Sequence, residues 1–124
     1  MANILLFIDN PKFGEVLGKK GHQLFNFTTK ESALDCVRSQ KLDLALVEAD
    51  QNTGMEVMQE LHQLEPQLRL LMVTGSPSLP RLRQALSLGV QEILFLPLDA
   101  EELEGKVTKV AKATKRNLKE ALAL

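Results

Sequence analysis

The sequence contains a single cysteine, Cys36, and no cluster of cysteines and histidines at metal-ligand spacing. One cysteine cannot form an internal disulfide bond, so this composition favours a reducing compartment, and we expect a cytoplasmic protein. The longest continuous apolar run, Ile4–Ile8, is far too short to span a bilayer or to form the core of a signal peptide. These shortages argue against membrane-spanning proteins, secreted proteins and Cys/His metal proteins.

An excess of charge of one sign is also missing. The 15 Lys and Arg residues nearly balance the 16 Asp and Glu residues, and the formal net charge is −1. Because a nucleic-acid-binding domain normally carries a basic surface, this balance argues against a nucleic acid as the partner. A chain of 124 residues is long enough for one globular domain and too short for a multi-domain enzyme. We therefore expect residues 1–124 to form one domain.

The apolar residues alternate between two patterns along the chain. Short continuous runs are typical of strands that are buried on both faces in a parallel sheet. Longer stretches, with apolar residues every three or four positions, predict amphipathic helices. The expected strands are Ile4–Ile8, Leu24–Phe27, Leu42–Val47, Leu68–Val73 and Ile93–Leu96. The expected helices are Phe13–Lys19, Glu31–Ser39, Met55–Leu64, Leu82–Leu88 and a last helix from Ala100.

Residues at the ends of these segments support the assignment. Thr29 and Asp99 stand where N-caps of the second and fifth helices belong. Gly21 and Gly89 follow the first and fourth helices, where a left-handed residue is common. Strict alternation of strands and helices with right-handed crossovers predicts a doubly wound α/β sandwich. In such a fold, chemistry occurs at the carboxyl ends of the strands.

Five ordered blocks of this sequence resemble the receiver domains of two-component response regulators. The blocks are Ile4–Pro11, Leu42–Glu48, Gly54–Met58, Leu71–Gly75 and Ala85–Leu98. The resemblance implies a CheY-like, flavodoxin-like (βα)5 fold with a parallel five-stranded sheet in the order 2-1-3-4-5. It also implies an active cleft above the first and third strands.

The same resemblance implies how that cleft would work. Receivers hold Mg²⁺ with an acidic pair after the first strand and accept a phosphoryl group on an Asp that ends the third strand. A Ser or Thr after the fourth strand and a Lys after the fifth then bind the phosphoryl oxygens. In this chain, these positions hold Ile8 and Asp9, then Glu48, Thr74 and Leu96.

The departures predict a degenerate receiver, a pseudo-receiver. Glu48 is one methylene longer than Asp, and in-line transfer tolerates errors of ~1 Å poorly. Leu96 supplies no cation, and without an acid at Ile8 only Asp9 and Glu48 remain as metal ligands, so we expect weak Mg²⁺ binding and no other cofactor. The connection from Glu48 to Gly54 is two residues shorter than the usual family loop, which gives Gly54 a structural role and reshapes the cleft rim.

Several alternatives stay open at this stage. A register shift of two would make Asp50 the phosphoacceptor, but it would push Glu48 into the buried strand at a high cost. Asp9 and Glu48 could be solvated carboxylates, a vestigial cation site or a fixed charge that mimics phosphorylation, with Thr74 moving toward Glu48. The polar loop at 75–78 could bind an anion through its backbone N–H groups or be a simple turn.

Four further positions have structural interpretations. The resemblance implies a cis peptide bond between Leu96 and Pro97. His22 and His62 have no ligand partners at suitable spacing, so we expect surface positions for both. Cys36 lies on an apolar helical face and is interpreted as a small core residue.

The last helical stretch is longer than a receiver's closing helix needs. Residues 113–124 could extend as a helix toward an absent output module or a dimer partner, or they could be a frayed end. Their lysines could contact nucleic acid, but no aromatic residues interleave with them, which argues against it.

We therefore expect a non-catalytic signalling module that acts by protein–protein interaction, through either a tethered output domain or a homodimer. The expected interaction face consists of the fourth helix, fifth strand and fifth helix and includes Arg81, Arg83, Gln84 and Gln91. One alternative is an atypical receiver that still accepts phosphate. The other is a flavodoxin-like binder of a small ligand, although no strand-end loop has the Ser, Thr and Gly content that a flavin phosphate needs.

Overall fold

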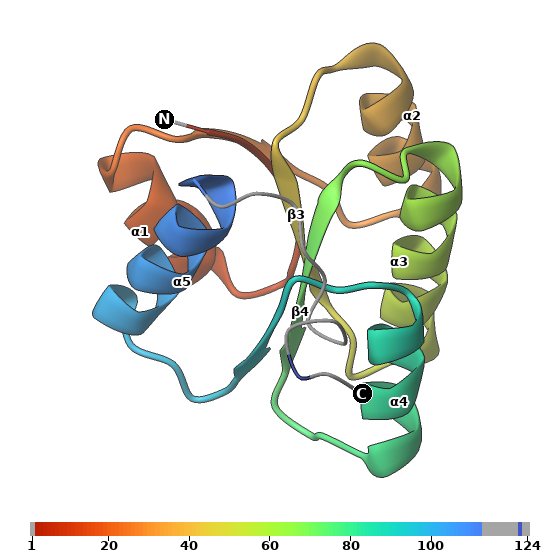
Figure 1. The fold of residues 1–124 in the computed structure, drawn as a ribbon. Coiled ribbons are helices and arrows are strands. Elements are labelled where there is room, and N and C mark those ends of the chain that lie inside the picture. The colour runs from red at the N-terminus through yellow and green to blue at the C-terminus, as the bar shows by residue number, and fades with distance from the viewer. Residues whose placement is uncertain (1, 113–121, 123–124) are drawn as a thin grey trace.

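The computed structural model describes residues 2–112 and residue 122, and it contains five strands and five helices in strict alternation (Figure 1). The strands are β1 (Asn3–Phe7), β2 (Gln23–Asn26), β3 (Leu44–Glu48), β4 (Arg69–Thr74) and β5 (Glu92–Phe95). The helices are α1 (Pro11–Lys19), α2 (Lys30–Ser39), α3 (Asn52–Leu64), α4 (Leu79–Ser87) and α5 (Ala100–Lys112). The extension expected at 113–124 lies outside the described residues, apart from Leu122.

All neighbouring strands are parallel, and the sheet order is β2-β1-β3-β4-β5, which confirms the expected fold class. Helices α1 and α5 cover one face of the sheet, and α2, α3 and α4 cover the other (Figure 1). The strand order reverses at β1 and β3. The carboxyl ends of these two strands therefore border the crevice where a ligand site is expected in an open α/β sheet.

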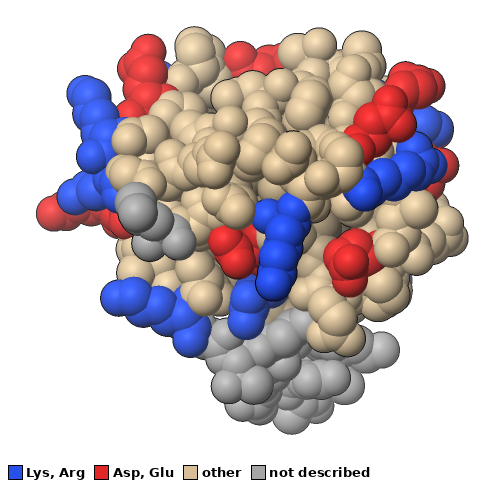
Figure 2. Space-filling view, turned by 90° about the horizontal axis from the view of Figure 1, so that it is seen from above, with Lys and Arg blue, Asp and Glu red and all other residues tan. Residues whose placement is uncertain are grey.

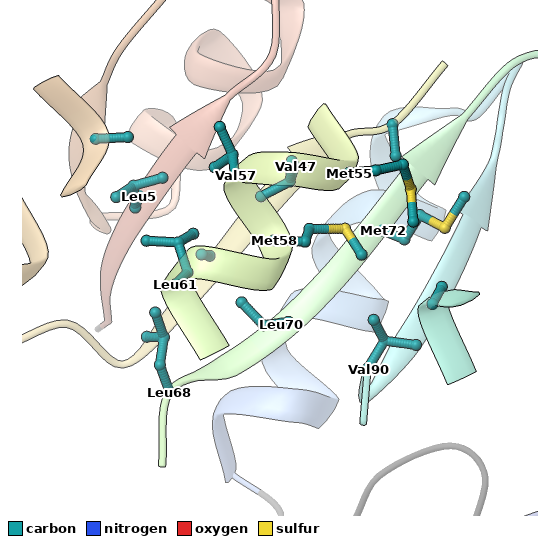
Figure 3. Close-up of a cluster of buried hydrophobic side chains, with 14 of the residues drawn as sticks. Leu5, Val47, Met55, Val57, Met58, Leu61, Leu68, Leu70, Met72 and Val90 are labelled. Atoms are coloured by element: carbon teal, nitrogen blue, oxygen red, sulfur yellow. The ribbon is translucent and has the colours of Figure 1, made fainter. Parts of the chain in front are cut away.

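Each face of the sheet has its own hydrophobic core. The core under α2, α3 and α4 includes Leu5, Val47, Met58, Leu61 and Met72, all completely buried (Figure 3). The core under α1 and α5 combines strand residues from the opposite face of the sheet with helix residues; it includes Ile4, Leu6 and Leu46 from the strands, Leu17 from α1 and Val107 from α5. Burial of one such side chain contributes about 1.5–3 kcal/mol. The central strands β1, β3 and β4 are packed on both faces, and this packing fixes the positions of their carboxyl ends.

Several element boundaries differ from the expected ones. α4 begins at Leu79 rather than Leu82, because the Ser78 side chain accepts a hydrogen bond from the Arg81 N–H and Pro80 occupies the first turn. α3 begins at Asn52 rather than Met55, and β3 begins at Leu44 rather than Leu42. For α3, which begins with Asn52 and Thr53, apolar spacing gives no signal because the first turn is polar.

The predicted capping residues are confirmed. The Thr29 hydroxyl accepts a hydrogen bond from the Ser32 N–H at 3.3 Å, and the Asp99 carboxylate accepts one from the Glu102 N–H at 2.7 Å. Gly21 and Gly89 have φ values of 84° and 79°, the left-handed region that favours glycine. These caps and turns fix where each helix leaves the sheet.

The expected surface position of His22 is wrong. Its side chain is only 8% exposed, its Nδ1 accepts a hydrogen bond from the Ala2 N–H at 3.1 Å, and its Nε2 lies 3.5 Å from the Glu104 carboxylate. The turn at Gly21 folds the histidine back between the start of β1 and α5, which apolar periodicity cannot reveal. Cys36, by contrast, is buried as expected.

The surface charge is mixed. On the face shown in Figure 2, basic and acidic side chains alternate around a largely uncharged centre, with no broad patch of one sign. Within residues 2–112, no helix is long and apolar enough to cross a membrane.

Candidate functional site

The carboxyl ends of β1 and β3 border a cavity of about 330 Å³. Its walls come from the segments that follow β1, β2 and β3. The lining residues are Phe7, Ile8, Asp9, Phe27, Thr28, Glu48, Asp50, Gln51, Thr53 and Gly54. The structure thus brings Asp9 and Glu48 to one cleft, as the strand-end argument predicts, together with Asp50.

Glu48 is the last residue of β3 and is half-buried. Burial raises the pKa of its carboxyl group above the ordinary value, and the negative charges of Asp50 and Asp9 add to this effect. A hydrogen bond from the Asp9 backbone partly offsets the rise in pKa. Among the described residues, no positive side chain is one of the groups that shift the pKa of Glu48, and its one stabilising partner is the Asp9 backbone, on the β1 side of the cleft.

Asp50 lies two residues after Glu48, and its carboxylate is turned toward the end of β4. Its Oδ1 accepts hydrogen bonds from the Thr74 hydroxyl and, at 3.1 Å each, from the N–H groups of Gly75 and Ser76. Its Oδ2 accepts a second, shorter bond of 2.9 Å from the Gly75 N–H. One side chain thereby joins the β3–α3 loop to the β4–α4 loop.

These contacts determine the protonation of Asp50. Partial burial acts to raise the pKa of its carboxyl group, but the hydrogen bonds from Thr74, Gly75 and Ser76, together with the charge of Arg81, outweigh burial and lower the pKa below its ordinary value. Asp50 is therefore ionised at neutral pH. Two acidic groups close together in the sequence thus have pKa shifts of opposite direction.

Thr74 is completely buried at the end of β4. Its hydroxyl donates to Asp50 and accepts a hydrogen bond from the Ser76 N–H at 3.2 Å. In this structure the partner of the Thr74 hydroxyl is Asp50, and Glu48 is not bonded to it. The loop at 75–78 does bind an anion through backbone N–H groups, and that anion is the chain's own carboxylate.

The position after β5 is apolar. The Leu96 N–H donates to the Thr74 carbonyl oxygen at 2.8 Å, which places this residue beside the end of β4. Carbon atoms of Leu96 lie 3.6 Å from the point where a Cβ on Gly75 would stand, and Asp50 Oδ2 lies 3.6 Å from the same point. Leu96 and the Asp50 carboxylate therefore both pack beside Gly75. The Leu96–Pro97 peptide bond is cis, the isomer that the resemblance implies.

The short loop after β3 depends on Gly54. A Cβ at this position would overlap the Glu48 carbonyl oxygen and come within 2.9 Å of the Ala49 Cα. The Gly54 N–H also donates to the Gln51 carbonyl oxygen at 3.1 Å. The first turn of α3 therefore packs directly on the end of β3.

The residues in the cleft do not fit a complete magnesium site. Ile8 offers no oxygen ligand, and the carboxylate of Asp50 is already bound to three donors. Within the described part of the chain, no group of three or more His, Cys, Asp or Glu side chains is placed to hold a metal ion. Asp9 and Glu48, the two oxygen ligands that the sequence predicts, both line the cleft.

The predicted interaction face is partly exposed. Arg83 and Gln84 are exposed on α4, whereas Arg81 and Gln91 are half-buried. Two large apolar side chains are exposed at the same end of the sheet, Leu79 at 59% and Phe95 at 50%. The sequence does not single out this pair, because Phe95 lies in an expected buried strand and Leu79 lies before the expected start of the fourth helix.

Comparison with known proteins agrees with the geometry. Residues 11–108 match the family model described as response regulator receiver domain. The chain is 25% identical to sporulation initiation phosphotransferase F of Bacillus subtilis, over 88% of this chain and 94% of that protein. It is 24% identical to the transcriptional regulatory protein GlrR of Escherichia coli, over 98% of this chain but only 30% of that protein.

Solved structures show the same fold. A CheY-like response regulator receiver domain protein from Methanospirillum hungatei has a TM-score of 0.81 and 23% identity, covering 90% of this chain and 94% of that one. NtrX from Brucella abortus, in complex with ADP, also has a TM-score of 0.81, at 19% identity, covering 98% of this chain and 29% of that one.

Proposed function

Because the chain belongs to the response regulator receiver domain family, we propose that it is a receiver that signals by protein–protein interaction and does not accept a phosphoryl group. Receiver domains are in general non-enzymatic signalling modules, and we assign this one no enzymatic activity. The module would work in the cytoplasm, with a protein rather than a nucleic acid or a membrane as its partner.

The observation that carries the proposal is the position of the Asp50 carboxylate. The Thr74 hydroxyl, which the family resemblance assigns to the phosphoryl oxygens, donates instead to Asp50, and so do the N–H groups of Gly75 and Ser76. A phosphoryl group would have to compete with an ionised carboxylate for these donors. Leu96 offers it no cation in return.

The acidic residues support the same conclusion. Glu48 stands at the acceptor position, and its extra methylene displaces the carboxylate oxygens from where an Asp would hold them. Its raised pKa reflects burial and the nearby charges of Asp50 and Asp9, which little positive charge offsets. We propose that Asp9 and Glu48 bind Mg²⁺ only weakly and that the domain needs no cofactor. Without an acid at position 8, one oxygen ligand of the family's metal site is missing.

The proposed docking face is formed by α4, β5 and α5. The exposed side chains of Leu79 and Phe95 would supply apolar contact area, and Arg83 and Gln84 would supply polar contacts at the rim. The chain spans only about a third of GlrR and NtrX. These much longer relatives favour a tethered output domain as the partner, with a homodimer through the same face as the second candidate.

A phosphorylation experiment tests the proposal. The purified chain is incubated with acetyl phosphate and Mg²⁺, and its intact mass is measured beside that of a receiver that retains the Asp and Lys. We expect no phosphoryl adduct on this chain and a clear adduct on the comparison protein. A metal-dependent, hydrolysable adduct that disappears in Glu48→Gln or in Asp50→Asn would refute the proposal and identify an atypical phosphoacceptor.

A further inference from the structure

We propose that the end of β4 forms a carboxylate-binding pocket, that Asp50 is its built-in ligand, and that removal of the Asp50 side chain opens this pocket to acetate. This proposal rests on the proposed function only because it treats the pocket as part of a signalling module. Thr74, Gly75 and Ser76 define the pocket, and carboxylate binding there is separate from phosphoryl transfer.

The donors converge on one small volume. The Thr74 hydroxyl and the N–H groups of Gly75 and Ser76 all point at Oδ1 of Asp50, and the Gly75 N–H also reaches Oδ2 at 2.9 Å. The Ser76 N–H also supports the Thr74 hydroxyl at 3.2 Å, so the hydroxyl is held in place by the loop. Such a nest of donors binds an anion, and the charge of Arg81 also favours the ionised carboxylate here.

The surroundings favour a carboxylate over a tetrahedral oxyanion. Four of the hydrogen bonds go to the two oxygens of one planar group. Aliphatic carbons of Leu96 lie 3.6 Å from the point where a Gly75 Cβ would stand, so an apolar side chain packs beside the same glycine. The Thr74, Gly75 and Ser76 donors are arranged around two oxygens, so the additional oxygens of phosphate would gain no hydrogen bond from them. The two oxygens of a carboxylate match these donors better.

The chemistry of the side chain defines the ligand further. An Asp side chain is a methylene group that carries a carboxylate, so Asp50→Gly removes a fragment that differs from acetate by a single hydrogen atom. Asp50→Ala leaves the first carbon in place and therefore leaves room for formate. The two variants should thus prefer different ligands, which a non-specific salt effect would not produce.

The experiment uses the full chain labelled with ¹⁵N and follows the amide signals of Gly75 and Ser76. In Asp50→Gly, we expect acetate to shift both signals saturably toward their wild-type positions, with a Kd on the order of 10 mM for so small a ligand. In Asp50→Ala, formate should act at lower concentrations than acetate. The wild-type signals should not respond, because Asp50 already fills the pocket.

Controls separate this pocket from other effects. Sodium chloride at equal ionic strength should leave the two amide signals of Asp50→Gly unchanged, and phosphate should shift them less than acetate does. Adding Thr74→Val to Asp50→Gly should weaken acetate binding at least fivefold. If acetate shifts the wild-type and Asp50→Gly signals equally, shifts neither, or binds more weakly than phosphate, the proposal is wrong.

A second measurement keeps the proposal testable if Asp50→Gly does not fold. In the wild-type chain, the amide signals of Gly75 and Ser76 should move at the same midpoint pH as the carboxyl carbon of Asp50. Independent midpoints would contradict the pocket. A phosphoryl adduct on the wild-type chain, by contrast, would refute the proposed function and leave these amide measurements unaffected.

Discussion

Two carboxyl groups at the end of β3 experience opposite surroundings, although one residue separates them. Glu48 is half-buried near Asp9 and Asp50, and its pKa is raised. Asp50 receives hydrogen bonds from Thr74, Gly75 and Ser76, and its pKa is lowered. The sign of each shift determines how each residue contributes to stability as the pH changes.

We predict that Glu48→Gln stabilises the domain at neutral pH. The folded-state pKa of Glu48 lies above its ordinary value of 4.5, so the charged form destabilises the folded state above that pKa, and protonation relieves this effect as the pH falls. Glutamine removes the charge but keeps an oxygen for the Asp9 backbone. The free energy of unfolding in urea should rise by up to about 1 kcal/mol at pH 7. The difference should vanish below pH 4.5, and a less stable variant at pH 7 would contradict this assignment.

Asp50→Asn should have the opposite effect. The folded-state pKa of Asp50 lies below its ordinary value of 3.8, so its stabilising contribution is complete above that value and is lost as the pH falls through the folded-state pKa. The variant loses charge-assisted hydrogen bonds at the β4–α4 loop. Because solvent screens this half-buried group, we expect a loss of about 1 kcal/mol at pH 7. Urea denaturation at pH 7 and at pH 3 measures the change, and an equal loss at both values would exclude a charge effect.

At the scale of elements, the start of α3 packs against the end of β3 through a glycine. We predict that Gly54→Ala destabilises the domain by about 2–3 kcal/mol, because its Cβ would overlap the Glu48 carbonyl oxygen and force the backbone to shift. Gly105→Ala in α5 is the matched control. Nothing lies within 4 Å of its Cβ position, so alanine should stabilise the helix by up to about 1 kcal/mol. Urea midpoints that fall equally in both variants would show that the close contact at Gly54 does not matter.

The elements also show what the sequence can and cannot predict. Apolar runs and helical spacing predict the order of strands and helices, because burial on both faces leaves a strong pattern in β3 and β4. Strand ends then place Asp9, Glu48 and Thr74 near one cleft. The direction of Asp50 depends on the geometry of a shortened loop, and the burial of His22 depends on how a turn packs on α5. Neither arrangement has a periodic signal.

At the scale of the whole molecule, the cleft and the proposed docking face are neighbours in the sheet. Thr74, which is bound to Asp50, pairs with Phe95 across β4 and β5. Phe95 is 50% exposed, and Leu79 begins the helix that follows the Asp50-bound loop. We therefore expect the Asp50 carboxylate, through Thr74 and the loop before α4, to keep Phe95 and Leu79 in one arrangement without phosphorylation.

The homodimer form of this proposal predicts a measurable change in association. Phe95→Ser and Leu79→Ser each remove exposed apolar area that would be buried in the interface. Sedimentation equilibrium should therefore give a dimer dissociation constant at least tenfold higher for each variant, a loss of about 1.4 kcal/mol in association free energy. Leu64→Ser is the matched control, because Leu64 is 42% exposed at the end of α3, outside this face. Its dissociation constant should match that of the wild type.

If the wild-type chain stays monomeric at all concentrations, the homodimer is excluded and a separate protein or a tethered domain remains as the partner on this face. If Leu64→Ser alone weakens association, the interface lies on α3, because only contacts at that helix would then be lost.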